Sequence, residues 1–138
     1  MLSNEIRIRV RYGEVDRMGY LHHGNYALYF EEGRTELIRK LGLTYREMED
    51  QGILLPVREF HIHYFKPALY DDEIIIRTSL SKYPSVRLDF DYKMLNSKGE
   101  LLSEAKTTLV FVDAATRKPM RVPEFFEKLI APYFPDKD

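Results

Sequence analysis

The residues best suited to chemistry are concentrated in one polar segment, residues 12–26. The segment contains a carboxylate, Asp16, followed by the adjacent histidines His22 and His23. Gly24 comes next, directly before a stretch whose pattern predicts a helix. Unpaired backbone N–H groups at a helix N-terminus, helped by the helix dipole, stabilise negative charge on an oxygen atom. Because a nearby carboxylate can act as nucleophile or general base, we interpret this segment as a candidate catalytic site.

An ordinary loop explains the same residues differently. Asp and Gly are common turn residues, so Asp16 and Gly19 on their own are also typical of a turn. In that interpretation Asn25 only caps the helix. In the catalytic interpretation, Gly24 would let a substrate approach the backbone closely. Other standard sites are absent, since the sequence has no phosphate-binding glycine loop, no dinucleotide fingerprint and no Gly-x-Ser-x-Gly elbow.

Composition excludes several classes of protein. The chain has 138 residues, so we expect residues 1–138 to form a single domain. The 21 Lys and Arg nearly balance the 22 Asp and Glu, and a net charge of -1 argues against a nucleic-acid binder. The absence of Cys excludes disulfides, thiolate metal sites and cysteine nucleophiles. With no signal-peptide pattern and no apolar run near the ~20 residues of a membrane span, we expect a cytoplasmic protein.

Hydrophobic periodicity predicts the elements that must position the polar segment. Alternation over residues 6–10 predicts a strand, and an apolar stripe over residues 25–41 predicts a long helix. A capping-box pair predicts a short helix over residues 44–52. Period-two alternation from residue 57 onward predicts four more strands joined by short turns, and Pro at an early position predicts a terminal helix over residues 123–133. Sequential strands with tight connections make an antiparallel sheet, so the fold class is α+β, with about five strands curved around the long helix.

One predicted strand carries a second candidate for chemistry, the pair His61 and His63. Residues two apart in a strand point to the same side, which suits a metal ion. No third or fourth ligand is evident in the sequence. A partly exposed sheet face or a subunit contact explains the pair more simply, so we predict no metal site.

Further motifs accompany the polar segment along almost the whole chain, from about Ile6 to Pro123. They are Asp16-Arg17-Met18-Gly19, His22-His23-Gly24-Asn25-Tyr26, Tyr29-Phe30-Glu31, Arg34-Thr35-Glu36, Val57-Arg58, Tyr64-Phe65-Lys66-Pro67-Ala68, Asp71-Asp72, Glu104-Ala105, and Val112-Asp113 followed by Lys118-Pro119. In this combination the sequence resembles the hot-dog superfamily, in its 4-hydroxybenzoyl-CoA thioesterase-like branch. Within that branch it is most similar to the acyl-CoA thioesterases associated with the Tol–Pal cluster.

The resemblance implies that an acyl-CoA thioester is hydrolysed to a free carboxylic acid and coenzyme A. Asp16 matches the family's catalytic carboxylate, acting as nucleophile or as the base that activates water. The carbonyl oxygen would lie against backbone N–H groups near His23, Gly24 and Asn25. His23 would polarise the carbonyl or orient the acyl group, with a packed structural histidine as the alternative. No metal or redox cofactor is required, because coenzyme A is part of the substrate.

The resemblance also implies where the substrate binds. The residues expected around the acyl group are Tyr20, Leu21, His22, Tyr26 and Tyr29. The competing role for these residues is core packing. Glu14 and His22 stand where many relatives carry Asp and Tyr, and these differences bear on the acyl pocket. The residues expected to contact the phosphates of coenzyme A are Arg117, Lys118 and Arg121, with Arg87 and Ser85 as weaker candidates. The competing interpretation of these residues is a solvated turn.

The expected partners are acyl-CoA and further copies of the same chain. The resemblance implies a homodimer or homotetramer with active sites at the subunit interface, and the open edges of a sheet favour self-association. Two other functions stay open. One is a thioesterase acting on acyl carrier protein, because the basic residues also suit an acidic partner. The other is a non-catalytic acyl-CoA sensor or scaffold. A DNA-binding regulator is disfavoured, because we expect no appended recognition domain in this sequence.

Overall fold

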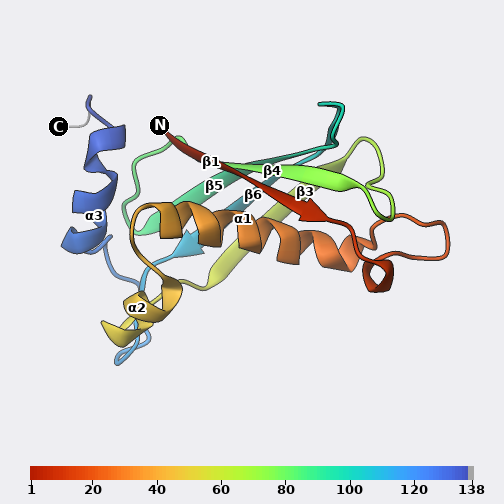
Figure 1. The fold of residues 1–138 in the computed structure, drawn as a ribbon. Coiled ribbons are helices and arrows are strands. Elements are labelled where there is room, and N and C mark those ends of the chain that lie inside the picture. Colours follow the sequence, from red (N-terminus) through yellow and green to blue (C-terminus); the bar gives the residue numbers. More distant parts are fainter. Residues whose placement is uncertain (137–138) are drawn as a thin grey trace.

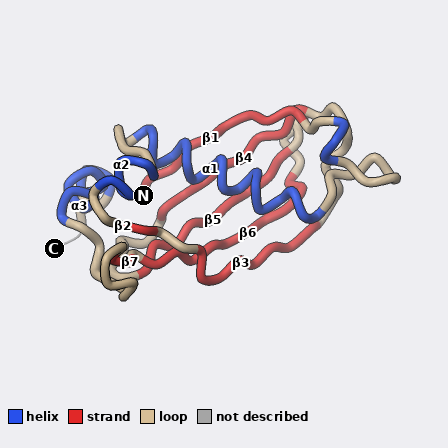
Figure 2. Tube along the Cα trace, turned by 90° about the horizontal axis from the view of Figure 1, so that it is seen from below, coloured by secondary structure: helices blue, strands red, loops and turns tan. Residues whose placement is uncertain are grey.

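One curved antiparallel sheet with a long helix across it dominates the computed structural model, which describes residues 1–136 (Figures 1 and 2). The strand order is β1-β4-β5-β6-β3, and every neighbouring pair is antiparallel. This arrangement confirms the α+β class and the predicted hot-dog architecture. The strands are β1 (Leu2–Arg9), β3 (Val57–Tyr64), β4 (Glu73–Leu80), β5 (Arg87–Leu95) and β6 (Leu101–Val110).

The long helix α1 (Tyr26–Lys40) packs one face against the sheet. Its buried positions recur every three or four residues, as an amphipathic helix requires. Rings fill the contact: Phe30 lies 4.9 Å from Tyr92 of β5 and 6.2 Å from Phe60 of β3, measured between ring centroids. The buried residues of α1 are Tyr26, Tyr29, Phe30, Gly33, Arg34, Leu37 and Ile38.

Arg34 is the one charged residue in this buried stripe of α1. It is only 6% exposed, and its Nη1 donates a long hydrogen bond of 3.5 Å to the Tyr92 hydroxyl. That hydroxyl also lies 2.7 Å from Oγ1 of Thr107 on β6. The sequence pattern did not predict this polar network, because a single arginine in an apolar stripe is typical of a side chain that extends to solvent.

Several element boundaries differ from the predicted ones. The first strand begins at Leu2, four residues before the predicted start, because the main chain pairs with β4 over its full length. A small second sheet of β2 (Ile53–Leu54) and β7 (Val112–Asp113) was not predicted, since two residues are too few to show alternation. The short helix α2 (Tyr45–Asp50) is confirmed, with Thr44 Oγ1 accepting from the Glu47 N–H. The terminal helix α3 covers Glu124–Ile130 and continues as a 3-10 turn, Ala131–Tyr133.

Gly33 allows α1 to approach the sheet closely. A Cβ atom at this position would lie 2.5 Å from Oγ1 of Thr78 and 2.8 Å from Cγ2 of Ile76, both on β4. Real contacts of this kind are longer, so only a residue without a side chain fits. No helix within residues 1–136 is long and apolar enough to cross a membrane.

Gly33→Ala should therefore destabilise the protein. Overpacking of a filled core forces neighbouring side chains and backbone to move, and we expect the free energy of unfolding to fall by about 1–3 kcal/mol. Chemical denaturation measures this change. Gly13→Ala is the matched control, because a Cβ there meets no atom within 4 Å. Equal stabilities for Gly33→Ala and the wild type would contradict the close approach.

Candidate active site

The segment that precedes α1 folds as a small hairpin. Val15 and Leu21 form an antiparallel bridge, and the Asp16 N–H donates to the Tyr20 carbonyl at 2.9 Å. The turn closes where the Gly19 N–H donates to the Asp16 carbonyl, and Gly19 adopts φ +79°, a left-handed conformation that suits glycine. The hairpin is also tied to the rest of the chain, since the Leu21 N–H donates to the Ala68 carbonyl. Asp16 therefore occupies a defined position beside the start of α1.

The two oxygens of the Asp16 carboxylate have different surroundings. Oδ1 accepts hydrogen bonds from the backbone N–H groups of Met18 at 2.9 Å and Tyr20 at 3.2 Å. Within residues 1–136, Oδ2 accepts none. The carboxylate is thus held through one oxygen while the other is available to a substrate or a water molecule, as a nucleophile or general base requires.

The start of α1 supplies fewer free N–H groups than the sequence suggested. A 3-10 turn, His23–Asn25, precedes the helix, and its geometry uses the Asn25 N–H to donate to the His22 carbonyl. The Gly24 N–H donates to Nδ1 of His22 at 3.1 Å. Within the described residues, the His23 N–H alone among these three has no acceptor. Asn25 does not cap the helix with its side chain, whose Nδ2 instead donates to the Glu14 carbonyl at 2.9 Å.

A hollow of about 320 Å³ opens beside Asp16. Five of the predicted site residues meet there, and a second group comes from the end of β3 and the loop after it. Burial raises the pKa of Tyr26, whose ring packs edge-on against Tyr64 at 4.9 Å between centroids. The hollow is lined by Asp16, Tyr20, Leu21, His23, Tyr26, Tyr64, Phe65, Lys66 and Pro67.

Residues 64–67 were not predicted as part of the site. The available signal was the motif Tyr64–Pro67, which belongs to the family resemblance but carries no obvious catalytic group. Two expected substrate contacts are not in the lining. His22 is exposed, with its ring on the Gly24 N–H, and Tyr29 is buried, with its hydroxyl donating to Oε1 of Glu14 at 2.5 Å.

Glu14 is the most strongly perturbed acid near the site. A hydrogen bond from the Arg11 side chain is the main cause that lowers the pKa of Glu14 from 4.5 to about 2. Burial opposes this effect, and a bond from Tyr29 adds to it. Burial is in turn the largest cause that raises the pKa of Tyr29, followed by its bond to Glu14. The pair therefore consists of an ionised carboxylate and a neutral phenol at neutral pH.

The residues expected to bind coenzyme A lie together, but far from Asp16. Ser85 and Arg87 lie beside each other, where the Val122 N–H donates to the Ser85 carbonyl and the Ser85 N–H to the Arg87 carbonyl. Lys118 follows the turn after β7, and its carbonyl accepts from the Asp113 N–H. This end of the molecule, with β2, β7 and α2, is opposite the hairpin (Figure 2). The 15 residues of α1 span roughly 22 Å between the two regions, so one chain does not bring them together.

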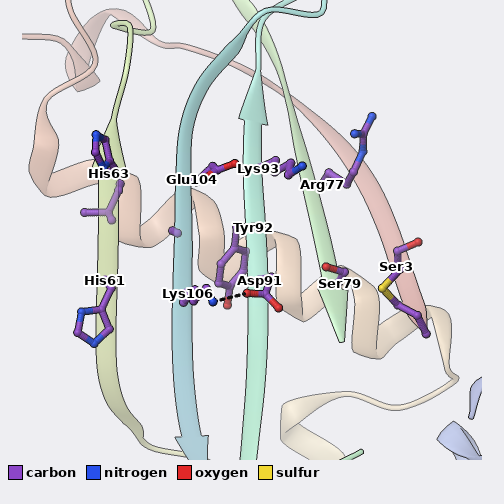
Figure 3. Close-up of a pocket in the computed structure, with 13 residues that line it drawn as sticks. Ser3, His61, His63, Arg77, Ser79, Asp91, Tyr92, Lys93, Glu104 and Lys106 are labelled. Atoms are coloured by element: carbon purple, nitrogen blue, oxygen red, sulfur yellow. Dashed lines mark ion pairs between the residues drawn. The ribbon is translucent and has the colours of Figure 1, made fainter. Parts of the chain in front are cut away.

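A larger hollow of about 690 Å³ lies on the face of the sheet that turns away from α1 (Figure 3). His61 and His63 project there from β3. Charged neighbours surround them, including the ion pair of Lys106 and Asp91 at 3.7 Å. Within residues 1–136, no three His, Cys, Asp or Glu side chains are grouped as a metal ion would require.

The fold and the hollow together define a class of protein, a hot-dog domain with a carboxylate beside the start of its central helix. Comparison with known proteins identifies the family. Residues 10–130 match the Thioesterase-like superfamily, so the chain belongs to this superfamily and is a thioester hydrolase.

Relatives and solved structures agree with this assignment. YneP of Bacillus subtilis is 37% identical over 119 residues, 86% of each chain. The acyl-CoA thioester hydrolase YbgC of Escherichia coli O6:H1 is 29% identical over 85% of this chain and 87% of its own. A crystal structure of DHNA-CoA thioesterase from Staphylococcus aureus is 38% identical with a TM-score of 0.83, covering 99% of this chain and 86% of that one.

The lowered pKa of Glu14 predicts a pH-dependent contribution to stability. Because its pKa falls on folding, the contribution is complete above the unfolded value of about 4.5 and disappears as the pH falls towards 2. We expect Glu14→Gln to lower the free energy of unfolding by about 1–3 kcal/mol at pH 7, and by progressively less between pH 5 and pH 2. Denaturation of both proteins across this range measures the difference. A difference independent of pH would contradict an ionised Glu14 in the folded state.

Proposed function

We propose that the protein is an acyl-CoA thioesterase in which Asp16 is the catalytic carboxylate. The observation that carries this proposal is the asymmetry of Asp16, with Oδ1 held by two backbone N–H groups and Oδ2 free beside a hollow. Relatives support the substrate class, since YbgC of E. coli is named an acyl-CoA thioester hydrolase. The reaction converts an acyl-CoA and water into a carboxylic acid and coenzyme A.

The proposed chemistry has two alternative routes. In the first, Oδ2 of Asp16 attacks the thioester carbonyl, the C–S bond breaks to release the thiolate of coenzyme A, and water hydrolyses the resulting anhydride. In the second, Asp16 takes a proton from a water molecule whose oxygen attacks the carbonyl, and the departing thiolate receives that proton. In both routes the His23 N–H is the donor available to the carbonyl oxygen.

The acyl group would occupy the hollow beside Asp16. Tyr20, Leu21 and Tyr26 line it, and the rings of Tyr64 and Phe65 add apolar surface. Acyl carrier protein is the alternative carrier of the acyl group. Two relatives from Arabidopsis thaliana are named acyl-acyl carrier protein thioesterases and are 28% and 32% identical. Kinetics on the same acyl group carried by each partner distinguish the two substrates, and tight binding without turnover would instead indicate a sensor.

We further propose that the active enzyme is a homodimer joined through β3. Within residues 1–136, this strand is at the edge of the sheet and pairs with β6 alone. It exposes apolar side chains, among them Val57 at 46% and Tyr64 at 47%. Antiparallel pairing of two copies would place the start of one β3 beside the end of the other. The basic end of one chain, with Arg87, Arg117, Lys118 and Arg121, would then approach Asp16 of the other, and pairs of dimers would form a tetramer.

Asp16→Asn tests the proposed mechanism. Asparagine keeps the shape of the side chain but removes the charge that attacks or takes a proton, so we expect kcat/KM for acyl-CoA hydrolysis to fall by at least about 100-fold. Asp50→Asn is the matched control, since Asp50 is exposed at the end of α2. Full activity in a folded Asp16→Asn protein would remove Asp16 from the mechanism.

Val57→Asp tests the proposed dimer. A charge on the apolar edge of β3 opposes pairing of two copies, so we expect a shift from dimer to monomer by light scattering, with loss of acyl-CoA turnover. Ser3→Asp places the same charge on β1, the opposite edge of the sheet, and should leave the dimer intact. A wild-type protein that is monomeric and fully active would refute the interface.

A further inference from the structure

Glu14 stands at the base of the hairpin that carries Asp16, and its carboxylate binds three donors. The Tyr29 hydroxyl of α1 donates to Oε1 at 2.5 Å. The Arg11 backbone N–H also donates to Oε1, at 2.9 Å, and Nη2 of Arg11 donates to Oε2 at 2.8 Å. The Glu14 side chain is only 14% exposed, whereas that of Arg11 is 73% exposed, so of these bonds the one from buried Tyr29 is the best shielded from water.

The backbone carbonyl of Glu14 binds two further donors. It accepts from the His22 N–H at 2.8 Å, which closes the base of the hairpin. It also accepts from Nδ2 of Asn25 at 2.9 Å, directly before the first residue of α1. Glu14 thus connects both ends of the segment 15–25 to each other and, through Tyr29, to the end of the first turn of the helix.

This connection determines where Asp16 lies relative to the helix. Only Val15 separates Glu14 from Asp16 in the chain, and the bonds inside the hairpin keep the Asp16 carboxylate fixed relative to Tyr20. The bonds of Glu14 then keep the whole hairpin fixed relative to α1. The distance between the free Oδ2 of Asp16 and the His23 N–H depends on both sets of bonds.

We propose that Glu14 and Tyr29 are positioning residues, which act on the proposed reaction by holding the Asp16 hairpin against the start of α1. The inference rests on the proposed role of Asp16, and it gives Tyr29 a role other than substrate binding. A displacement of about 1 Å at a reacting group costs up to 10²-fold in rate, so a pair that touches no substrate still affects turnover. The ionised state of Glu14 and the neutral state of Tyr29 agree with this role.

Tyr29→Phe is the most direct test, because it removes the hydroxyl and keeps the packed ring. Amide hydrogen exchange comes first, since it does not depend on activity. We expect the N–H groups of Asp16, Met18, Tyr20 and His22 to exchange at least about 10-fold faster, with the sheet unchanged. Tyr45→Phe is the control, because it removes a buried hydroxyl of α2 that does not contact the hairpin. Unchanged exchange in the hairpin would overturn the proposal, whatever the protein hydrolyses.

A double-mutant cycle with Asp16→Asn tests the link to turnover. We expect Tyr29→Phe to lower kcat by about 10-fold with little change in KM, and to have no effect when Asp16 is already replaced. Glu14→Gln should behave in the same way, and Glu14→Asp should recover part of the loss. Equal effects of Tyr29→Phe with and without Asp16 would refute positioning through Asp16. A wild-type protein without turnover would instead refute the proposed function, and the exchange data would still decide whether Glu14 and Tyr29 hold the hairpin.

Discussion

The contact between α1 and the sheet at Gly33 sets the geometry on which the rest of the molecule depends. Without a side chain at Gly33, the helix backbone lies directly against Thr78 and Ile76. Phe30 and Tyr92 fill the space beside this contact. A helix packed this closely cannot rotate or slide without repacking the core, so its first turn has a fixed place at the end of the sheet. The position of the Asp16 hairpin depends on this fixed first turn of α1.

The direction of α1 relative to β3 has a second consequence. Tyr26 packs on Tyr64 and Phe30 on Phe60, so the two elements run antiparallel, and the end of β3 lies beside the start of the helix. The hollow at Asp16 is therefore built from both. The same arrangement places the start of β3 and the basic end of the chain at the far end of α1. A ligand that needs both regions requires a second chain, which gives the proposed dimer a chemical reason and not only a structural one.

The sequence predicted what depends on repeating patterns and local motifs. Alternation and the helix stripe were sufficient for the α+β class, the central helix and the five long strands. Contacts between distant residues were beyond its reach. The bond between Tyr29 and Glu14 spans 15 positions, and nothing in the pattern separates such a tyrosine from one that lines a pocket. Residues 64–67 join the site only because β3 ends beside α1, and buried Arg34 depends on partners up to 58 positions away.

His22 shows how the start of α1 limits the chemistry that the segment can support. Its Nδ1 accepts from the Gly24 N–H. Of the Gly24 and His23 N–H groups, only that of His23 is therefore free for a carbonyl oxygen. The ring is exposed, and within the described residues this is its only hydrogen bond. Breaking one such bond costs about 1 kcal/mol, whereas one donor to a developing oxyanion contributes about 3 kcal/mol. This gain arises at the transition state and not in the bound substrate, so the bond observed here is compatible with the role expected of the Gly24 N–H.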